Sequence, residues 1–589
     1  MDNFFNYSKN NNDLLFKSFN ESHILIEKPQ NYIPIYNLFF EINKTNFNNF
    51  NLELSNTLHN IISAHSYSSF NVELINNNND KVVKTDCFFK YSPLIDPCKY
   101  LAGKFKGNDL YELPKLNNTA IDNFTRTNNF AYVDSIFSFL SSVLLNKFNF
   151  IHGLDFYGSY LGIKNNFKYN IIDDLDYLEN NDYFNENLNK DFKIINMEKH
   201  NIFKNLSKKN KLKLDINDDL INIDFDNINE LNNINDVIVS ETESNLIKEN
   251  LDLIYNSTLS KSKTNSSSSS SCSSRTSNTL STSFNDDELE NNDKDHDNNS
   301  LCTDLDSDSD DDYTENSSAS DDIDDDIYVN INKFPVCAIC LEKCDNTLDY
   351  LLEEDMLNNN ELASCFFQII MTLLVYQNVF SFTHNDLHTN NIMFIHTDKP
   401  YLYYFYKNRH YKVPTYNKIY KIIDFGRSVY SINNKIVMSD CFAKDGDAAT
   451  QFNCLPYYND KKKKIEPNYS FDLCRLGCSL FDFFSDDLEN IKKIKNTKDN
   501  KLYVQLIKMI SDWCLDDNNK NILYKKNGDE RYPNFKLYKM ITRTVHRWTP
   551  ESEIERELFN SFIVNRKKIQ KKATIMNIDK FFLIFNKKK

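Results

Sequence analysis

Two short polar motifs, each following an apolar stretch, place the strongest constraint on how this chain of 589 residues can fold. The first reads His384-x-Asp386-x-x-x-x-Asn391, and the second is an Asp-Phe-Gly tripeptide that begins at Asp424. Two carboxylates and an amide oxygen that meet in one place can orient a hydroxyl group and bind Mg²⁺ beside the phosphates of a nucleotide. The fold is therefore expected to bring Asp386, Asn391 and Asp424 together.

A third motif, Asp-x-x-x-Leu-Gly, begins at Asp472, which follows Asp424 by 48 residues. Together the three motifs resemble the catalytic loop, the metal loop and a supporting helix start of the eukaryotic-type protein kinase superfamily. The stretches Phe89–Pro97 and Phe150–Ser159 resemble, more narrowly, the divergent protein kinases of large DNA viruses. The resemblance extends from about residue 50 to the C-terminus, apart from a long insertion.

The resemblance implies a role for each matching residue. Asp386 would orient the substrate hydroxyl and accept its proton, while Asn391 and Asp424 would hold Mg²⁺. Lys90, in a predicted strand, would contact the α- and β-phosphates of ATP. Its acidic partner on the following helix would be Asp134, an aspartate where the family has glutamate.

Other roles are implied for the backbone around these residues. Asp472 would support the catalytic loop from beneath rather than take part in the chemistry. Lys84 is the alternative to Lys90, and we favour Lys90 because three apolar residues, Cys87-Phe88-Phe89, precede it. A hinge between two lobes would bind adenine through its backbone. The hinge residues are Leu341, Glu342, Lys343 and Cys344.

Three features depart from the family pattern. Asn385 replaces the arginine that usually clamps a phosphorylated activation segment, so activity is expected not to depend on such phosphorylation. His388 stands where Ser/Thr kinases usually carry a lysine. No Gly-x-Gly-x-x-Gly occurs in the chain, and the stretch Ala64–Asn71 is the only candidate for a hairpin tip to cover the phosphates in its place.

The net charge of −16 comes from one segment of the chain. Residues 286–326 contain 19 acidic side chains and one lysine, so the rest of the chain is close to neutral. The Ser-rich and acidic stretch 257–326 is expected to be disordered, because it has too few large apolar residues to offset its ordering entropy. It would form part of an insertion at about 165–326 that could bind partners or be phosphorylated.

Hydrophobic periodicity predicts the elements on either side of this insertion. Strands are expected at Val82–Tyr91 and Phe334–Glu342, and further strand material with glycine turns at Phe148–Leu161. Helices are expected at Phe130–Leu145 and Glu361–Phe380, the second leading directly into the catalytic motif.

This order of elements, with the resemblance, implies an α+β fold of two lobes. A small β-rich N-terminal lobe, interrupted by the insertion, would cover residues 51–344 after an N-terminal extension, 1–50. A larger helical C-terminal lobe would cover residues 345–589.

The function implied by the resemblance is Mg²⁺- and ATP-dependent phosphorylation of Ser or Thr in protein substrates. Two alternatives stay open: a pseudokinase that scaffolds partners, and a small-molecule phosphotransferase. Thirteen scattered cysteines, an N-terminus without a signal pattern and the lack of an apolar run of about 18 residues predict an intracellular protein outside membranes, in a host cell or virion if it is viral. The lysine-rich runs do not predict specific nucleic-acid binding.

Overall fold

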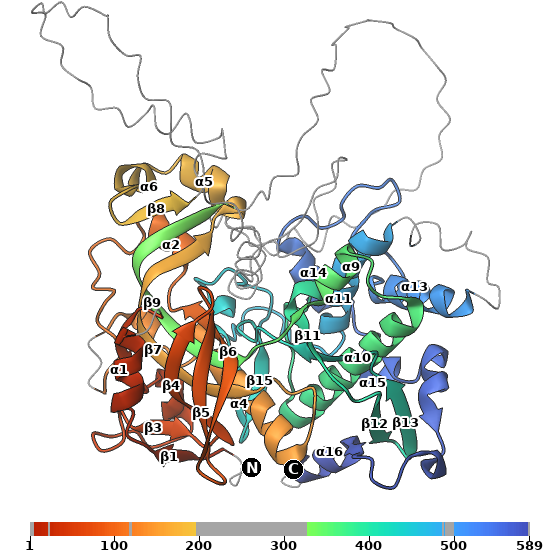
Figure 1. Ribbon diagram of the computed structural model, residues 1–589. Coiled ribbons are helices and arrows are strands. Elements are labelled where there is room, and N and C mark those ends of the chain that lie inside the picture. Colours follow the sequence, from red (N-terminus) through yellow and green to blue (C-terminus); the bar gives the residue numbers. More distant parts are fainter. Residues whose placement is uncertain are drawn as a thin grey trace, which may run out of the picture.

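The computed structural model describes residues 5–21, 24–116, 120–195, 327–485, 488 and 500–586 (Figure 1). Over these residues the fold is of the mixed α+β class, with a β-rich N-terminal part and a helix-rich C-terminal part. This coarse division agrees with the sequence prediction. The stretch 257–326, predicted to be disordered, lies outside the described residues.

The N-terminal part is built on a seven-stranded antiparallel sheet. In spatial order its strands are β2 (Ile26–Gln30), β7 (Phe156–Asn170), β9 (Tyr328–Glu342), β6 (Lys81–Pro93), β5 (Ser69–Asn76) and β4 (Asn56–Ala64), and β8 (Phe192–Ile195) pairs with β9. The three consecutive strands β4, β5 and β6 form a meander, and β9 returns from far along the chain to lie between β6 and β7. The strands predicted at Val82–Tyr91 and Phe334–Glu342 are thus parts of β6 and β9.

Helix α4 (Phe130–Phe148) lies against this sheet (Figure 1). The side chain of Asn129 caps its first turn by accepting a hydrogen bond from the N–H of Ala131. It ends at Asn149, whose φ of 56° is the left-handed conformation common after a helix C-terminus. Because the helix continues to Phe148, the strand predicted from that residue starts only at Phe156.

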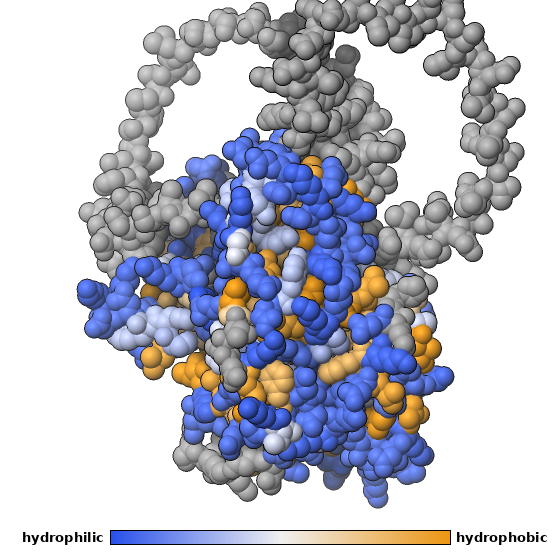
Figure 2. Space-filling view, turned by 90° about the vertical axis from the view of Figure 1, so that its left-hand side faces the viewer, coloured by the Kyte–Doolittle hydropathy of each residue, from blue (hydrophilic) through white to orange (hydrophobic). Residues whose placement is uncertain are grey.

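The described residues of the predicted N-terminal extension, 1–50, pack on the N-terminal part. Strand β1 (Tyr7–Lys9) pairs with β3 (Phe50–Leu52), α1 (Asp13–Glu21) packs on β4, and β2 pairs with β7. Phe19 and Phe50 are fully buried in the same core as the central strands. The face that carries α1 is mainly hydrophilic, with small scattered hydrophobic areas (Figure 2).

The insertion begins later than the predicted residue 165. The ladder between β7 and β9 continues to the pair Asn170↔Tyr328, and the helices α5 (Leu175–Glu179) and α6 (Asp182–Asn187) follow before β8. At the end of β8, Ile195 is paired with Tyr328. The chain therefore leaves the described structure and returns to it at neighbouring positions of one sheet.

The C-terminal part surrounds α10 (Asn359–Phe380), which Asn358 and Glu361 cap with a reciprocal capping box. Among the described helices, α10 alone is long and apolar enough to cross a membrane, but 94% of its most apolar window is buried in the fold, as in a core helix. Two further short helices, α2 (Pro97–Leu101) and α3 (Asp122–Thr125), belong to the N-terminal part. The other helices of the C-terminal part are α9 (Leu348–Glu353), α11 (Phe471–Phe481), α13 (Lys501–Trp513), α14 (Lys536–Thr544), α15 (Pro550–Glu553) and α16 (Ile578–Asn586).

Small sheets complete this part and carry the polar loops. A three-stranded sheet holds β11, which follows the His384–Asn391 motif, and β14, which precedes the Asp-Phe-Gly tripeptide, so the two motifs lie at the same end of neighbouring strands. The strands are β10 (Asn346–Thr347), β11 (Ile392–His396), β12 (Tyr401–Tyr406), β13 (Arg409–Pro414), β14 (Lys418–Ile422), β15 (Val429–Ile432), β16 (Lys435–Met438), β17 (Ile563–Val564) and β18 (Met576–Asn577).

Candidate active site

The loop that carries Asp386 is fixed from beneath by Asp472, the second residue of α11. The Asp472 carboxylate accepts hydrogen bonds from the backbone N–H groups of His384 and Asn385, each at 2.9 Å. The ring of His384 lies with Nε2 2.9 Å from the carbonyl oxygen of Ile423, just before the Asp-Phe-Gly tripeptide. Asp472 therefore occupies the supporting place predicted for it, and His384 links the two polar loops.

Asn391 stands at the end of the same loop. Its Nδ2 donates to the carbonyl oxygen of Asp386 at 2.9 Å and lies 3.1 Å from Nε2 of His388. Since an amide nitrogen only donates, Nε2 accepts and the neutral ring carries its proton on Nδ1. Burial lowers the pKa of His388 to about 4, so the ring is neutral at pH 7. With both Nδ2 protons engaged, Oδ1 is the atom of Asn391 that can bind a cation.

Lys90 joins the sheet to both α4 and the second polar loop. Its Nζ lies 2.7 Å from Oδ2 of Asp134 and 2.8 Å from Oδ1 of Asp424. The other carboxylate oxygen of Asp134 accepts from the backbone N–H of Phe425 at 3.0 Å. The expected pair of Lys90 with Asp134 is present, and the structure adds Asp424 to it.

The charges in this cluster stabilise one another away from water. Burial acts to lower the pKa of Lys90, but Asp134 and Asp424 outweigh it and raise that pKa, so the ammonium stays charged. Burial and the neighbouring Asp424 raise the pKa of Asp134, against the pull of Lys90. One cation thus faces two carboxylates, and the excess negative charge favours a further cation.

Mg²⁺, which the resemblance implies, fits these residues. Oδ2 of Asp424 is buried and has no hydrogen-bond partner among the described residues. No group of three or more His, Cys, Asp or Glu side chains in the described part of the chain could hold an ion by itself. Magnesium is commonly bound by one or two protein groups together with substrate phosphates and water. Asp424 and Asn391 are the protein groups that would hold it here.

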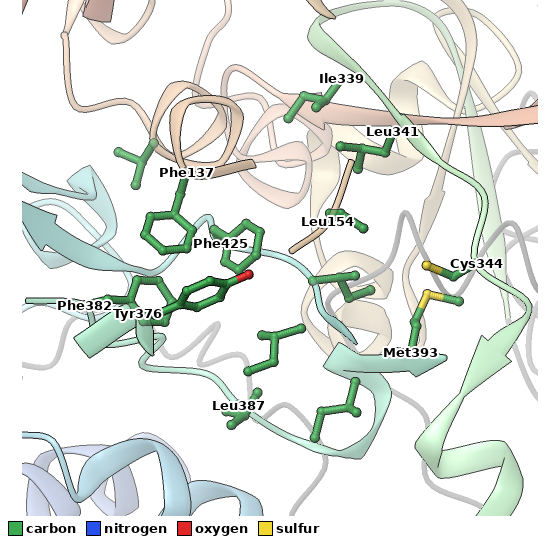
Figure 3. Close-up of a cluster of buried hydrophobic side chains, with 14 of the residues drawn as sticks. Phe137, Leu154, Ile339, Leu341, Cys344, Tyr376, Phe382, Leu387, Met393 and Phe425 are labelled. Carbon is green, nitrogen blue, oxygen red and sulfur yellow. The ribbon is translucent and has the colours of Figure 1, made fainter. Parts of the chain in front are cut away.

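Phe425 holds the second loop through a cluster of buried rings (Figure 3). Its ring centre lies 4.7 Å from that of Phe137 on α4, and 6.0 Å and 6.3 Å from those of Phe382 and Tyr376. All four residues are fully buried. This packing connects helix α4 of the N-terminal part to the C-terminal part and fixes the backbone next to Asp424.

Asp386 lies among three polar side chains from other elements. Tyr538 on α14 donates a hydrogen bond from Oη to Oδ1 at 2.8 Å. Nε of Arg427 lies 3.7 Å from Oδ2, and Nε of Arg475 lies 3.9 Å from Oδ1. Burial alone would raise the pKa of Asp386, but Arg427 and Arg475, with the hydrogen bond from Tyr538, hold it below the usual value. The carboxylate is therefore ionised and able to accept a proton.

The predicted hinge connects β9 to the C-terminal part. Leu341 and Cys344 are buried in the cluster of Figure 3, and Lys343 is exposed. The side chain of Glu342 pairs with Lys421 and accepts a hydrogen bond from the N–H of Asp155. The structure thus places these four residues at one junction, whereas their binding of adenine stays a prediction.

The predicted hairpin tip is the turn between β4 and β5. The carbonyl oxygen of Ser68 accepts from the N–H of Phe89, beside Lys90, and that of Tyr67 accepts from the hydroxyl of Tyr91 at 3.2 Å. Lys84 lies on the outer half of β6 with its side chain 67% exposed, 3.7 Å from Glu73. The sequence alternative Lys84 therefore lies outside the cluster of polar side chains.

A cavity of about 200 Å³ lies near this cluster but is distinct from it. It is lined by the turn after β6, the start of α4 and the segment 440–447, and Arg427 is its closest link to Asp386. Nη2 of Arg427 pairs with Asp447, and Nη1 of Arg126 lies 3.1 Å from Asp445. Acidic side chains of this segment therefore pair with arginines on the elements around it.

Sequence reasoning missed Arg427, Arg475 and Tyr538. Arg427 directly follows the Asp-Phe-Gly tripeptide and Arg475 lies within the third motif, so their positions were available as a signal. Tyr538 carries no local signal, because only the packing of α14 brings it to the loop.

No protein-family model matches the chain, and a search of curated proteins finds no match. What this chain does must therefore be inferred from its own residues.

Proposed function

We propose that the protein is an ATP-dependent protein kinase that transfers the γ-phosphoryl group of Mg-ATP to a Ser or Thr hydroxyl. The observation that carries this proposal is the position of Lys90, between Asp134 and Asp424 at 2.7 and 2.8 Å. Protein kinases require a strand lysine paired with an acid on the next helix, and a metal-binding aspartate of the Asp-Phe-Gly tripeptide.

The fold supports the same proposal. Lys90 lies on the third strand of the β4–β5–β6 meander, α4 follows with Asp134, and α10 leads directly into the loop of Asp386. A lysine on the third strand of a small lobe is the arrangement of protein kinases. We therefore propose a two-lobed kinase-like fold, with the lobes meeting at residues 341–344.

Each residue has a task in this reaction. Lys90 would bind the α- and β-phosphates and orient ATP, while Asp386, ionised and held in place, would accept the proton of the attacking hydroxyl. Bound by Asn391 and Asp424, Mg²⁺ supplies positive charge that offsets the negative charge developing on the phosphates. Because little covalent chemistry falls to the protein, its contribution is position and charge.

A pseudokinase that scaffolds partners is the second candidate. One observation favours it: the turn at residues 65–68 lacks glycine, and the hydroxyl of Tyr91 holds the carbonyl of Tyr67. A backbone that cannot approach phosphates closely would bind ATP weakly. Binding of Mg-ATP by the purified protein, measured by calorimetry, separates the two candidates before any substrate is known.

The decisive experiment is transfer of radiolabelled γ-phosphate to the protein itself and to a generic basic protein. Wild type is compared with Asp386→Asn and with the control Asp398→Asn, an exposed aspartate just after β11. We expect transfer by wild type and the control, and a loss of at least about 100-fold in Asp386→Asn. Acid hydrolysis of the labelled product identifies the residue type. A folded wild type that transfers nothing to either acceptor contradicts the proposal.

A further inference from the structure

The two carboxylate oxygens of Asp386 have different surroundings. Oδ1 accepts a hydrogen bond from Tyr538 at 2.8 Å and faces the buried α11–α14 side. Oδ2 lies 3.7 Å from Nε of Arg427, whose side chain is 13% exposed. The contacts of Asp472 fix the backbone of this loop, but they leave rotation of the Asp386 carboxylate about its own bonds undetermined.

The hydroxyl proton of Tyr538 has only one possible direction. Nε of Arg475 donates to the Tyr538 oxygen at 3.0 Å, and a guanidinium group has no acceptor. An ionised carboxylate, conversely, can only accept. The single hydroxyl proton must therefore point to Oδ1 of Asp386, which makes Tyr538 the link between Arg475 and the carboxylate.

Arg475 lies where burial of a positive charge costs free energy. It is fully buried, and its guanidinium carbon lies 5.4 Å from the centre of the Tyr538 ring. Among the described residues its one carboxylate partner within 4 Å is Asp386, and Nη1 and Nη2 have no hydrogen-bond partner. An apolar side chain often stabilises such a position as well as a buried ion pair does. The charge of Arg475 is thus better explained by its effect on Asp386 than by stability.

We propose that Tyr538 and Arg475 are positioning residues for the transfer reaction, which together hold Oδ1 of Asp386 and leave Oδ2 to receive the proton of the substrate hydroxyl. This inference rests on the proposed kinase function. In this inference, residues of α11 and α14 orient the Asp386 carboxylate, which the residues of the loop itself do not do. Tyr538 and Arg475 act through Asp386 and need not touch either substrate.

The test compares Tyr538→Phe with wild type in steady-state kinetics. The change removes one oxygen and retains the ring, so its effect reports the hydrogen bond. We expect kcat to fall by about 10- to 100-fold, the range for a hydrogen bond to a charged group, with KM for ATP within about twofold. Arg475→Met should cause a similar loss, and the double variant should lose no more than either alone, because both residues act through one hydroxyl.

The matched control is Tyr404→Phe, which removes a buried hydroxyl 2.7 Å from Nε2 of His152, outside the site. Its kcat should equal that of wild type, and thermal unfolding should show that all variants are folded. An unchanged kcat in Tyr538→Phe overturns the inference and leaves the kinase function standing. The inference is also overturned if Tyr538→Phe lowers kcat by the same factor in the Asp386→Asn variant as in wild type, because Tyr538 would then not act through Asp386. A wild type without transfer overturns the function and the inference together.

Discussion

Lys90 and Asp134 form an ion pair that water hardly reaches, with 2.7 Å between Nζ and Oδ2 and exposed fractions of 4% and 1%. The pair joins β6 to α4 across the N-terminal core. Because Asp424 lies on the other side of the same ammonium, this one cation also holds the second polar loop against the sheet. Loss of Lys90 would therefore affect both the site and the fold.

Lys90→Met should remove nearly all transfer activity and destabilise the protein. Two buried carboxylates would be left without a cation, a change that commonly costs about 3–5 kcal/mol. Initial rates and urea unfolding measure the two effects. Lys84→Met is the matched control, since it makes the same change on the same strand at a side chain that is 67% exposed. It should change stability by less than about 0.5 kcal/mol. A larger rate loss in Lys84→Met would show that the wrong lysine has been assigned.

Activity should not require phosphorylation of the segment after the Asp-Phe-Gly tripeptide. Asn385 stands where the kinases that this sequence resembles carry a phosphate-binding arginine, and Arg427 already pairs with the carboxylate of Asp447. Protein treated with phosphatase, and shown by mass spectrometry to carry no phosphate, should keep its full rate. Asp447→Asn should lower the rate about fivefold or more, because it releases the arginine beside Asp386. A phosphatase-treated protein that loses its activity contradicts this prediction.

The contribution of His152 to stability should fall as the pH drops from about 6.5 towards 4. Its ring is fully buried, with Nδ1 2.9 Å from the carbonyl oxygen of Tyr420 and Nε2 2.7 Å from the hydroxyl of Tyr404. Burial lowers the pKa of His152 to about 4, whereas an unfolded histidine titrates near 6.5. Between these values the unfolded state binds the extra proton, so the folded state loses up to about 1.4 kcal/mol per pH unit.

The histidine contribution can be isolated with His152→Gln, because other groups also titrate in acid. The variant should be less stable than wild type at pH 7.5, where it lacks the two ring contacts. On going from pH 6.5 to pH 5, its free energy of unfolding in urea should then lose less, or gain more, than that of wild type. Equal pH slopes for the two proteins would show that His152 is not the titrating group.

Phe88→Ala should strengthen ATP binding. Phe88 and Lys90 share one face of β6, and Phe88 is paired with Leu341 and only 3% exposed. Its side chain therefore lies beside Leu341 of the predicted adenine-binding segment and two positions from the predicted phosphate-binding lysine, where we expect the ring to take space that ATP would need. Removing the ring should lower KM for ATP several-fold, at a cost of about 3–5 kcal/mol in stability. The control Phe89→Ala removes a ring from the opposite face and should cost similar stability without lowering KM.

The sequence predicted the elements whose apolar pattern is long and regular. Helices α4 and α10 and strands β6 and β9 all lie where periodicity placed them, with ends that differ by at most six residues. The role of β2 in the central sheet was missed, because Ile26–Gln30 contains a proline and charged residues and shows no clear alternation. Its place depends on pairing with β7, more than a hundred residues away.

The candidate site, too, could be predicted only in part from the sequence. The motifs placed Asp386, Asn391 and Asp424 on two polar loops, and the structure brings these loops together at the same end of two neighbouring strands. The surroundings of Asp386 could not be predicted, because Tyr538 lies 152 residues away and depends on how α14 packs on α11. Local sequence thus specified the groups of the loops, whereas tertiary packing decides how firmly they are held.

The direct pairing of Ile195 with Tyr328 has a consequence for how such a chain can diverge. The two ends of the intervening sequence are already joined by the sheet, and the entropy of closing a loop rises only slowly with its length. Sequence between them can lengthen, shorten or acquire new recognition motifs with little effect on the distances among Lys90, Asp134 and Asp424. At this position in the sheet, new regulatory sequence can therefore be added during evolution without changing the arrangement of the candidate site.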